Sequence, residues 1–287
     1  MMQHTIENKI LDFAKNNENI RALLLNGSRA NPNIKPDKYQ DYDFCFIVEK
    51  LQDFISDKSW LEHFGKPYIY QFPHETFNAF EQGHVFTNYN FLVIFEAGYR
   101  IDFSFFEKGS MAKDFKIDSL TICYLDKDNL FENLPPTSEK DYYINAPSEK
   151  EFLDTANEFY WVATYVAKGL ARKEILYAKD MLENVVRPMF NQMLFWHIAL
   201  PYNFKINLGK SGKFVSQYLS EKAYNEILKT YTNADIESNF NALFLMLDLF
   251  EQWQKNIAEK LAFNIHIAEA KNTKNYMQKL YAERSFL

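Results

Sequence analysis

The N-terminal half of the chain alternates between short apolar runs and polar turns. Apolar runs of about four to eight residues bounded by turn residues are typical of buried β-strands, and two runs joined across Ala97 and Gly98 predict a β-hairpin. Ile6, Ile10 and Phe13 recur with a helical period and predict an opening helix. The expected elements are a helix over 5–16, strands over 21–25, 41–48, 91–95, 99–105 and 120–125, and mixed helix, turn and strand over 54–89.

The C-terminal half carries long helical periods without the alternation of strands. Ser148 and Glu151 have the spacing of a capping box, which starts a helix. Pro188 is expected to end a helix, because proline removes a hydrogen-bond donor and clashes with the preceding turn. The expected helices cover 148–170, 173–186, 189–200 and 240–261.

A break between the two halves lies at Pro135 and Pro136, since consecutive prolines interrupt both a helix and a central strand. We therefore predict an α+β protein with two domains. Residues 1–134 are expected to form a mixed β-sheet flanked by helices, and residues 135–287 a helical bundle.

Composition supports two domains and argues against some functions. The chain has 287 residues, of which 47% are hydrophobic, and this is enough for a large core or for two smaller ones. A formal net charge of −6 argues against a polymerase or tailing enzyme, which would carry a basic stripe for a phosphate backbone. We expect no nucleic-acid partner, and an acidic protein suits a polycationic small molecule.

Segments that would direct the chain to or through a membrane are not expected. The N-terminus has no basic region leading into an apolar core, and the apolar stretch 242–247 is far shorter than the roughly 20 residues that span a bilayer. Cys45 and Cys123 are two cysteines without a disulfide framework, so we expect reduced thiols. These features predict a cytoplasmic protein with no membrane partner, and they leave open whether it is a monomer or a homodimer.

Candidate chemistry begins where the first strand ends. Gly27 and Ser28 follow this strand, and a backbone turn with a hydroxyl at that point can approach phosphate oxygens. Asp41 and Asp43 then precede the next apolar run and, at a spacing of two, project to the same face of a strand. Mg²⁺ binds one or two such carboxylates and completes its shell with phosphate oxygens. The conjunction predicts Mg²⁺-dependent nucleotidyl transfer, although each piece alone is a weak signal.

A third carboxylate, Asp102, lies on the second strand of the predicted hairpin. If this hairpin extends the sheet that carries Asp41 and Asp43, Asp102 joins them, and two metal ions would stabilise the attacking and leaving oxygens of an in-line displacement. The alternative is that Asp102 occupies an exposed strand position and pairs with Arg100.

Longer strings around these residues resemble the aminoglycoside 6-adenylyltransferases of the nucleotidyltransferase superfamily, and the resemblance extends along most of the chain. In the N-terminal half it is carried by NGSRANPN at 26–33 and QDYD at 40–43. In the C-terminal half it is carried by WVATYVAKGL at 161–170 and RKEILYAKD at 172–180.

The resemblance implies an enzyme that transfers AMP from ATP to a hydroxyl of an aminoglycoside, most of all the 6-position of streptomycin, releasing pyrophosphate and inactivating the antibiotic. ATP is the implied co-substrate, with two Mg²⁺ ions as cofactor. Asp41, Asp43 and Asp102 are the expected catalytic and metal-binding residues, and ATP is expected to contact Gly27, Ser28, Arg29 and Lys210.

Carboxylates of the helical half are candidates for binding the acceptor, because a carboxylate can accept a guanidinium group in bidentate geometry. We expect this role for Glu158, Asp180 and Glu183, whereas Glu151 is explained by its capping position. Either Asp102 or Asp180 would accept the proton of the attacking hydroxyl.

The segment Leu208–Lys213 resembles a P-loop, but Phe204 stands where the motif requires its earlier glycine. We therefore exclude a Walker A motif. Lys210 or Lys213 remains a candidate phosphate contact, against the alternative of a solvated loop lysine.

Two other functions remain open. The first is a related nucleotidyltransferase that acts on another small molecule or on a protein hydroxyl, because a metal site specifies the reaction better than the acceptor. The second is a catalytically silent nucleotide-binding protein.

Overall fold

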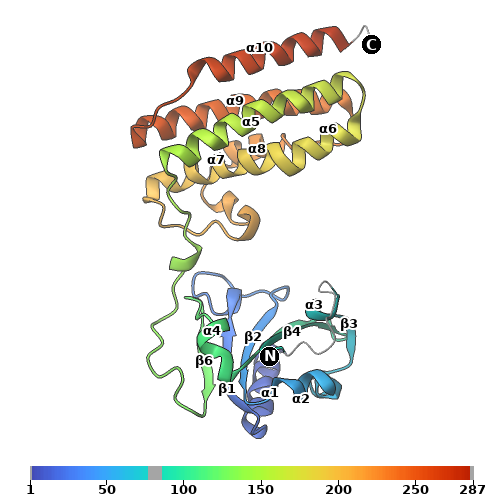
Figure 1. Cartoon of the computed structure of the whole chain (residues 1–287), viewed down its shortest axis with the longest axis vertical. Coiled ribbons are helices and arrows are strands. Elements are labelled where there is room, and N and C mark those ends of the chain that lie inside the picture. Colours follow the sequence, from blue (N-terminus) through green and yellow to red (C-terminus); the bar gives the residue numbers. More distant parts are fainter. Residues whose placement is uncertain (1, 77–85, 285–287) are drawn as a thin grey trace. The chain divides into compact units, whose positions relative to one another are not determined.

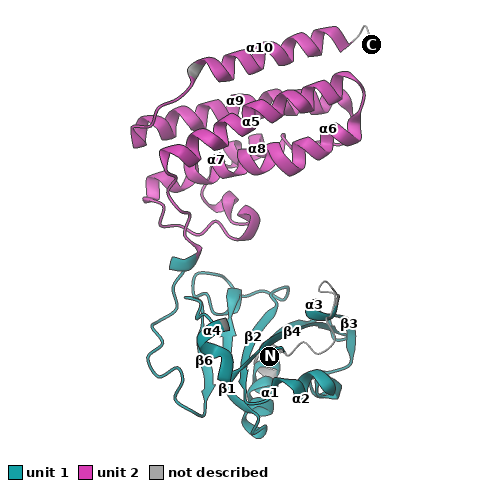
Figure 2. Ribbon diagram, in the orientation of Figure 1, with its two compact units in different colours: residues 1–141 teal, residues 142–287 magenta. Residues whose placement is uncertain are grey.

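The computed structural model describes residues 2–76 and 86–284. The chain divides into two compact units, Met1–Asp141 and Tyr142–Leu287, coloured teal and magenta in Figure 2. The predicted boundary after residue 134 lies inside unit 1. Residues 135–141 are held there by hydrogen bonds, since Ser138 N donates to Ser119 O at 2.9 Å and Asn31 Nδ2 donates to Glu139 Oε1 at 2.7 Å.

Unit 1 is built on a six-stranded mixed sheet with the strand order β3-β4-β5-β2-β1-β6 (Figure 1). β2 and β5 are parallel, and the other neighbouring strands are antiparallel. The predicted hairpin is confirmed as β4 and β5. The strands are β1 (Ile20–Asn26), β2 (Tyr42–Val48), β3 (Pro67–Gln71), β4 (Asn88–Phe95), β5 (Arg100–Glu107) and β6 (Ile122–Asp126).

Two hydrophobic clusters of unequal size cover the two faces of this sheet. On one face Phe44 and Phe46 pack with Ile10 and Phe54, which come from the flanking helices. On the other face Cys45 and Ile47 belong to a smaller cluster. The helices of unit 1 are α1 (Met2–Asn16), α2 (Leu51–Ser56), α3 (Pro73–Thr76) and α4 (Met111–Asp114). Part of the segment predicted as mixed structure, 77–85, lies outside the described residues.

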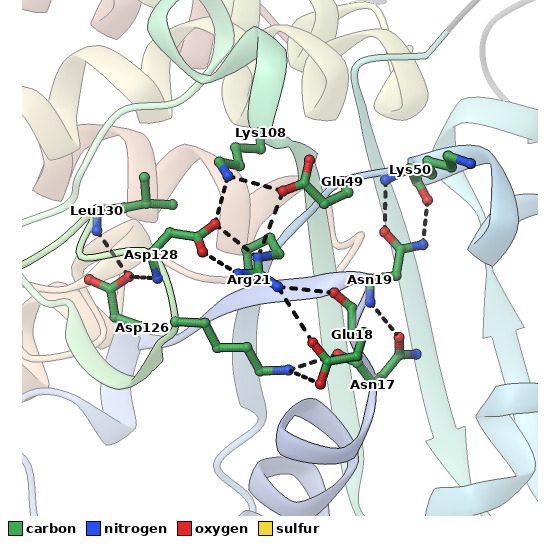
Figure 3. A network of polar contacts seen from close by, with 11 residues as sticks. Asn17, Glu18, Asn19, Arg21, Glu49, Lys50, Lys108, Asp126, Asp128 and Leu130 are labelled. Atoms are coloured by element: carbon green, nitrogen blue, oxygen red, sulfur yellow. Dashed lines mark hydrogen bonds and ion pairs between the residues drawn. The ribbon is translucent and has the colours of Figure 1, made fainter.

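A polar network ties together strand ends of the sheet at the end far from Asp43 (Figure 3). Arg21 at the start of β1 pairs with Asp128, to which it donates from Nε at 2.8 Å, and Lys108 Nζ also lies 2.6 Å from Asp128. Lys108 further pairs with Glu49, which follows β2. Hydrogen bonds from Arg21 and Lys108 hold the pKa of the Asp128 carboxyl well below its usual range. The network joins the ends of β1, β2, β5 and β6.

Unit 2 is helical, as the sequence predicts. Its core is aromatic, and the rings of Phe159 and Phe250 stack in parallel with their centroids 3.8 Å apart. The predicted capping box is confirmed, because the Ser148 side chain accepts from Glu151 N while Glu151 accepts from Ser148 N. The α-helices are α5 (Glu149–Ala171), α6 (Ile175–Met181), α7 (Arg187–Ala199), α8 (Glu221–Leu228), α9 (Ile236–Leu261) and α10 (Ile267–Glu283).

The predicted helix end at Pro188 is wrong. α6 continues through a π-helical segment, Leu182–Val186, directly into α7, and Pro188 lies in the first turn of α7. The wider π turn changes the hydrogen-bond pattern just before the proline, so the missing N–H and the bulk of the ring are tolerated there. A local rule about proline failed because the backbone before it is not α-helical.

Arg187 is a buried cation that links α7 to the segment after α8. Its guanidinium donates to Thr230 Oγ1 and Thr230 O, each at 2.7 Å, and to Glu183 at 3.1 Å. Arg187→Met should lower the free energy of unfolding by about 3 kcal/mol, because it leaves buried acceptors without donors. Urea denaturation measures this loss. The control Arg172→Met removes an exposed arginine and should change stability by less than about 0.5 kcal/mol; equal losses in the two variants would contradict the assigned role.

No helix within 2–76 and 86–284 is long and apolar enough to cross a membrane. Cys45 is buried and Cys123 is partly exposed, and both are free thiols.

Candidate active site

The parallel pairing of β2 and β5 brings two of the predicted carboxylates together. Asp43 and Asp102 are direct partners in the register, side by side on the face of the sheet that also carries Cys45. Asp41 lies just before β2, at the same end of the strand. The condition stated for Asp102 is therefore met, since the hairpin does extend the sheet that carries Asp43.

The turn after β1 approaches Asp43 very closely. Asn26, the last residue of β1, pairs with Asp43, and Gly27 then turns with a φ of +72°. A Cβ atom at Gly27 would lie 2.5 Å from Asp43 Oδ2, closer than real Cβ contacts. Only glycine therefore permits both the left-handed conformation and this approach. The turn continues as a short 3₁₀ segment, Gly27–Arg29, rather than an α-helix.

The environment of Asp43 disfavours its ionised form. Burial, helped by the neighbouring carboxylates of Asp102 and Asp41, raises the pKa of Asp43 to about 6 against a smaller lowering by Arg100 and Arg29. A cation placed among these oxygens would relieve the repulsion between them.

Arg100 lies on the same strand face as Asp102 and forms a bidentate pair with it. Its Nε and Nη2 atoms each donate to one carboxylate oxygen at 2.7 Å, and its Nη1 lies 3.6 Å from Asp41 Oδ2. The pair with Arg100, considered from sequence as the alternative for Asp102, is thus present, but the Asp102 side chain is only 18% exposed rather than fully exposed. The Asp102 carboxylate therefore lies beside Asp43 and is also paired with Arg100.

Arg29, a predicted contact of ATP, donates hydrogen bonds to backbone carbonyl oxygens just before β2. Its Nε donates to Asp41 O at 2.9 Å and its Nη2 to Gln40 O at 2.8 Å, while its Cζ lies 3.6 Å from the centre of the Tyr42 ring. The guanidinium therefore fixes the segment that carries Asp41. Ser28 is partly exposed in the adjacent turn.

Within 2–76 and 86–284, no group of three or more histidine, cysteine, aspartate or glutamate side chains forms a ready metal-binding cluster. Asp41, Asp43 and Asp102 are close in the fold, but Arg100 is paired with Asp102. This arrangement differs from a closed structural metal site.

The predicted acceptor-binding carboxylates lie in unit 2 and have different surroundings. Glu158 on α5 and Asp180 on α6 are exposed, and Asp180 accepts a hydrogen bond from Asn184 at 2.7 Å. Glu183 is already paired with Arg187 and, at 3.3 Å, with Lys179. Asp180 and Glu183 are thus bonded to different neighbours and not to each other.

A cavity of about 630 Å³ in unit 2 was not anticipated from the sequence. Its wall includes Glu151 and Asp154 together with the rings of Tyr143 and Trp196 and the amide of Gln192. Glu151 is held in the helix cap and Asp154 pairs with Lys150. The helical period of 149–171 shows which residues share a face, but the packing of α7 beside them is a tertiary contact that no local pattern reveals.

Lys210 lies in an exposed turn of unusual backbone conformation. Gly209, Ser211 and Gly212 all have φ between +56° and +78°, so the turn Lys210–Gly212 is kinked at Ser211, and no strand directly precedes it. The exclusion of a Walker A motif agrees with this geometry.

Known proteins that are similar to this chain along most of its length identify its family. The model of the streptomycin adenylyltransferase family matches residues 2–280. Aminoglycoside 6-adenylyltransferase from Bacillus subtilis (strain 168) is 38% identical over 257 residues, which are 88% of this chain and 89% of the relative. The protein of the same name from Staphylococcus aureus is 34% identical over 96% of this chain and 97% of the relative.

Among solved structures, the crystal structure of an aminoglycoside 6-adenyltransferase from Bacillus subtilis is 32% identical, covers 96% of this chain and 97% of its own, and has a TM-score of 0.48. The sequence matches span both units, including the Gly27 turn, the carboxylates of β2 and β5, and the helices of unit 2. The chain therefore belongs to the streptomycin adenylyltransferase family and is an adenylyltransferase.

Proposed function

We propose that this enzyme transfers AMP from ATP to a hydroxyl of an aminoglycoside, with the 6-position of streptomycin as the preferred acceptor, and releases pyrophosphate. The observation that carries the proposal is the pairing of Asp43 with Asp102 beside the Gly27 turn. Family membership supports the transfer of an adenylyl group. The names of the relatives support an aminoglycoside as the acceptor and its 6-position as the site of transfer. The reaction would inactivate the antibiotic.

Mg²⁺ fits the donor set of this site. Asp43 is a largely buried carboxylate with a raised pKa beside two others, and oxygen ligands of this kind suit a hard divalent cation. Asp41 and Asp43 would hold the first ion, and Asp102 would complete a second position. When bound with ATP, the metal would neutralise charge on the phosphates and on the departing pyrophosphate.

The remaining roles belong to the chain itself. The Gly27 turn, with Ser28, would place the phosphates against the carboxylates, because its backbone leaves no room for a side chain on that side. Arg29 would act by holding the segment that carries Asp41. Orientation of the α-phosphorus opposite the leaving group would supply much of the acceleration.

For the proton of the attacking hydroxyl we propose a carboxylate acceptor, either Asp102 or Asp180. Asp102 has the advantage of its position beside Asp43, while its lone pairs are engaged by Arg100. Asp180 is exposed and hence open to an acceptor molecule.

Unit 2 is proposed to bind the acceptor, and unit 1 to carry out catalysis. Glu158 and Asp180 are exposed carboxylates suited to guanidinium or ammonium groups, and Glu183 would contribute through the same helical segment as Asp180. Lys210 is proposed to contact the triphosphate from its exposed turn.

The test is to incubate the protein with ATP, Mg²⁺ and a panel of aminoglycosides, and to measure the mass of each drug. We expect one AMP added to streptomycin, no change in kanamycin-type drugs, and release of pyrophosphate. Modification of other hydroxyl compounds in place of streptomycin would favour a different acceptor, and ATP binding without any transfer would favour a silent nucleotide-binding protein.

A further inference from the structure

Arg100 places a permanent positive charge among the carboxylates of the active site. Its guanidinium uses both oxygens of Asp102, at 2.7 Å each, and approaches Asp41 Oδ2 at 3.6 Å. These are oxygens of the same carboxylates that the proposed function assigns to metal. The Arg100 side chain is 39% exposed, so it can move without opening the core.

We propose that Arg100 is a built-in counter-ion, which neutralises the metal-binding carboxylates in the nucleotide-free enzyme and gives way only when metal and nucleotide bind together. This inference depends on the metal site of the proposed function and adds the order in which that site is filled.

Arg100 and a metal ion compete for the same carboxylate oxygens. A guanidinium that forms two parallel hydrogen bonds with Asp102 leaves fewer lone pairs of that carboxylate for a metal. It also repels a divalent cation at short range in a partly buried site. Metal alone must therefore bind weakly while Arg100 is in place.

The triphosphate of a nucleotide would draw Arg100 away from Asp102. A phosphate group accepts the fork of an arginine as well as a carboxylate does, so a triphosphate offers Arg100 an equivalent partner, whereas a metal ion alone offers none. Metal and nucleotide would then favour each other's binding, and by linkage the effect is the same in both directions. The enzyme would thus avoid holding metal without its nucleotide.

The experiment measures binding of Mn²⁺, a paramagnetic substitute for Mg²⁺, by electron paramagnetic resonance without nucleotide. Arg100→Met removes the charge and keeps an apolar stem of similar length, and it should bind Mn²⁺ about tenfold or more tightly than the wild type. Arg100→Lys retains a charge and should stay close to the wild type. Arg100→Gln replaces Arg100→Met if the latter loses its cooperative unfolding transition.

Two controls locate the effect. Lys66→Met removes an exposed cation that pairs with Glu96 and should leave Mn²⁺ binding unchanged. Adding Asp43→Asn to Arg100→Met should abolish the gain, because the gained metal is held by the active-site carboxylates.

A second titration adds α,β-methylene ATP, which cannot release pyrophosphate. The analogue should tighten Mn²⁺ binding by a larger factor in the wild type than in Arg100→Met, since only the wild type has an arginine to be drawn away. Unchanged or weaker Mn²⁺ binding in folded Arg100→Met would overturn the inference. If the wild type nevertheless adenylylates streptomycin, the proposed function stands and only the role of Arg100 is wrong. If Mn²⁺ binding changes as expected but the wild type does not adenylylate streptomycin, the role of Arg100 stands and only the proposed acceptor is wrong.

Discussion

Asp43→Asn should abolish adenylyl transfer and at the same time stabilise the protein at neutral pH. The catalytic loss is expected to be about 10³-fold or more, because the substitution removes the charged oxygen that we propose as a metal ligand beside the reacting phosphates. Asp43 is the carboxylate closest to the Gly27 turn and the direct partner of Asp102. The measurement is the initial rate of pyrophosphate release at saturating ATP and acceptor.

The stabilisation follows from the sign of the pKa shift. The pKa of Asp43 rises from 3.8 to about 6 on folding, chiefly because of burial, so the native state binds a proton more tightly than the unfolded state. Between these two values the wild type loses stability as the pH rises, and the loss amounts to about 3 kcal/mol once both states are ionised. The amide that Asp43→Asn introduces stays neutral over this pH range, so the variant does not lose stability as the pH rises.

Urea denaturation at pH 4 and pH 7 tests the prediction. Asp43→Asn should exceed the wild type in stability at pH 7, and the excess should shrink towards pH 4. Mg²⁺ with ATP should stabilise the wild type and reduce the difference. The control Asp12→Asn, at an exposed position of α1, should show neither effect; a destabilised Asp43→Asn at pH 7 would contradict the assigned environment.

Gly27→Ala should lower both activity and stability. The new Cβ would lie 2.5 Å from Asp43 Oδ2, and the φ of +72° is unfavourable for alanine, so either the turn or the carboxylate must move. We expect a loss of about 10²-fold in kcat or more, since small displacements of a reacting geometry have effects of this size. Unfolding by urea should show a loss of about 2 kcal/mol or more.

Gly98→Ala provides the matched control. Gly98 also has a positive φ, +86°, but nothing lies within 4 Å of its would-be Cβ. Its substitution should therefore measure the conformational cost alone, about 1 kcal/mol, without loss of activity.

The clash itself is isolated by a double substitution. Asp43→Ala removes the oxygen that the new Cβ would meet, so in that background Gly27→Ala should cost about as much as Gly98→Ala. If Gly27→Ala were equally costly with and without the Asp43 carboxylate, the close approach would not be the cause.

Local patterns were sufficient for much of this fold. The continuous apolar run 44–48 identifies strand β2, the alternation of apolar and polar residues in 99–105 identifies β5, and the capping box at Ser148 marks the start of α5. At two places, however, the local patterns gave the wrong or no helix boundary. Pro188 does not end a helix because a π-helical turn precedes it, and the polar helix α10 has too weak an apolar stripe to be recognised, although it packs along α5.

By itself, the sequence determined the spacing of the candidate carboxylates, the glycine turn and the helical character of the second half, because spacing, turn residues and helical periods are properties of neighbouring residues. The tertiary structure decided which of these residues meet. Asp102 reaches Asp43 only because β5 pairs in parallel with β2, a contact between segments far apart in the chain. The same pairing buries Asp43 and raises its pKa, and burial depends on the packing of the whole sheet, which no short window of sequence specifies.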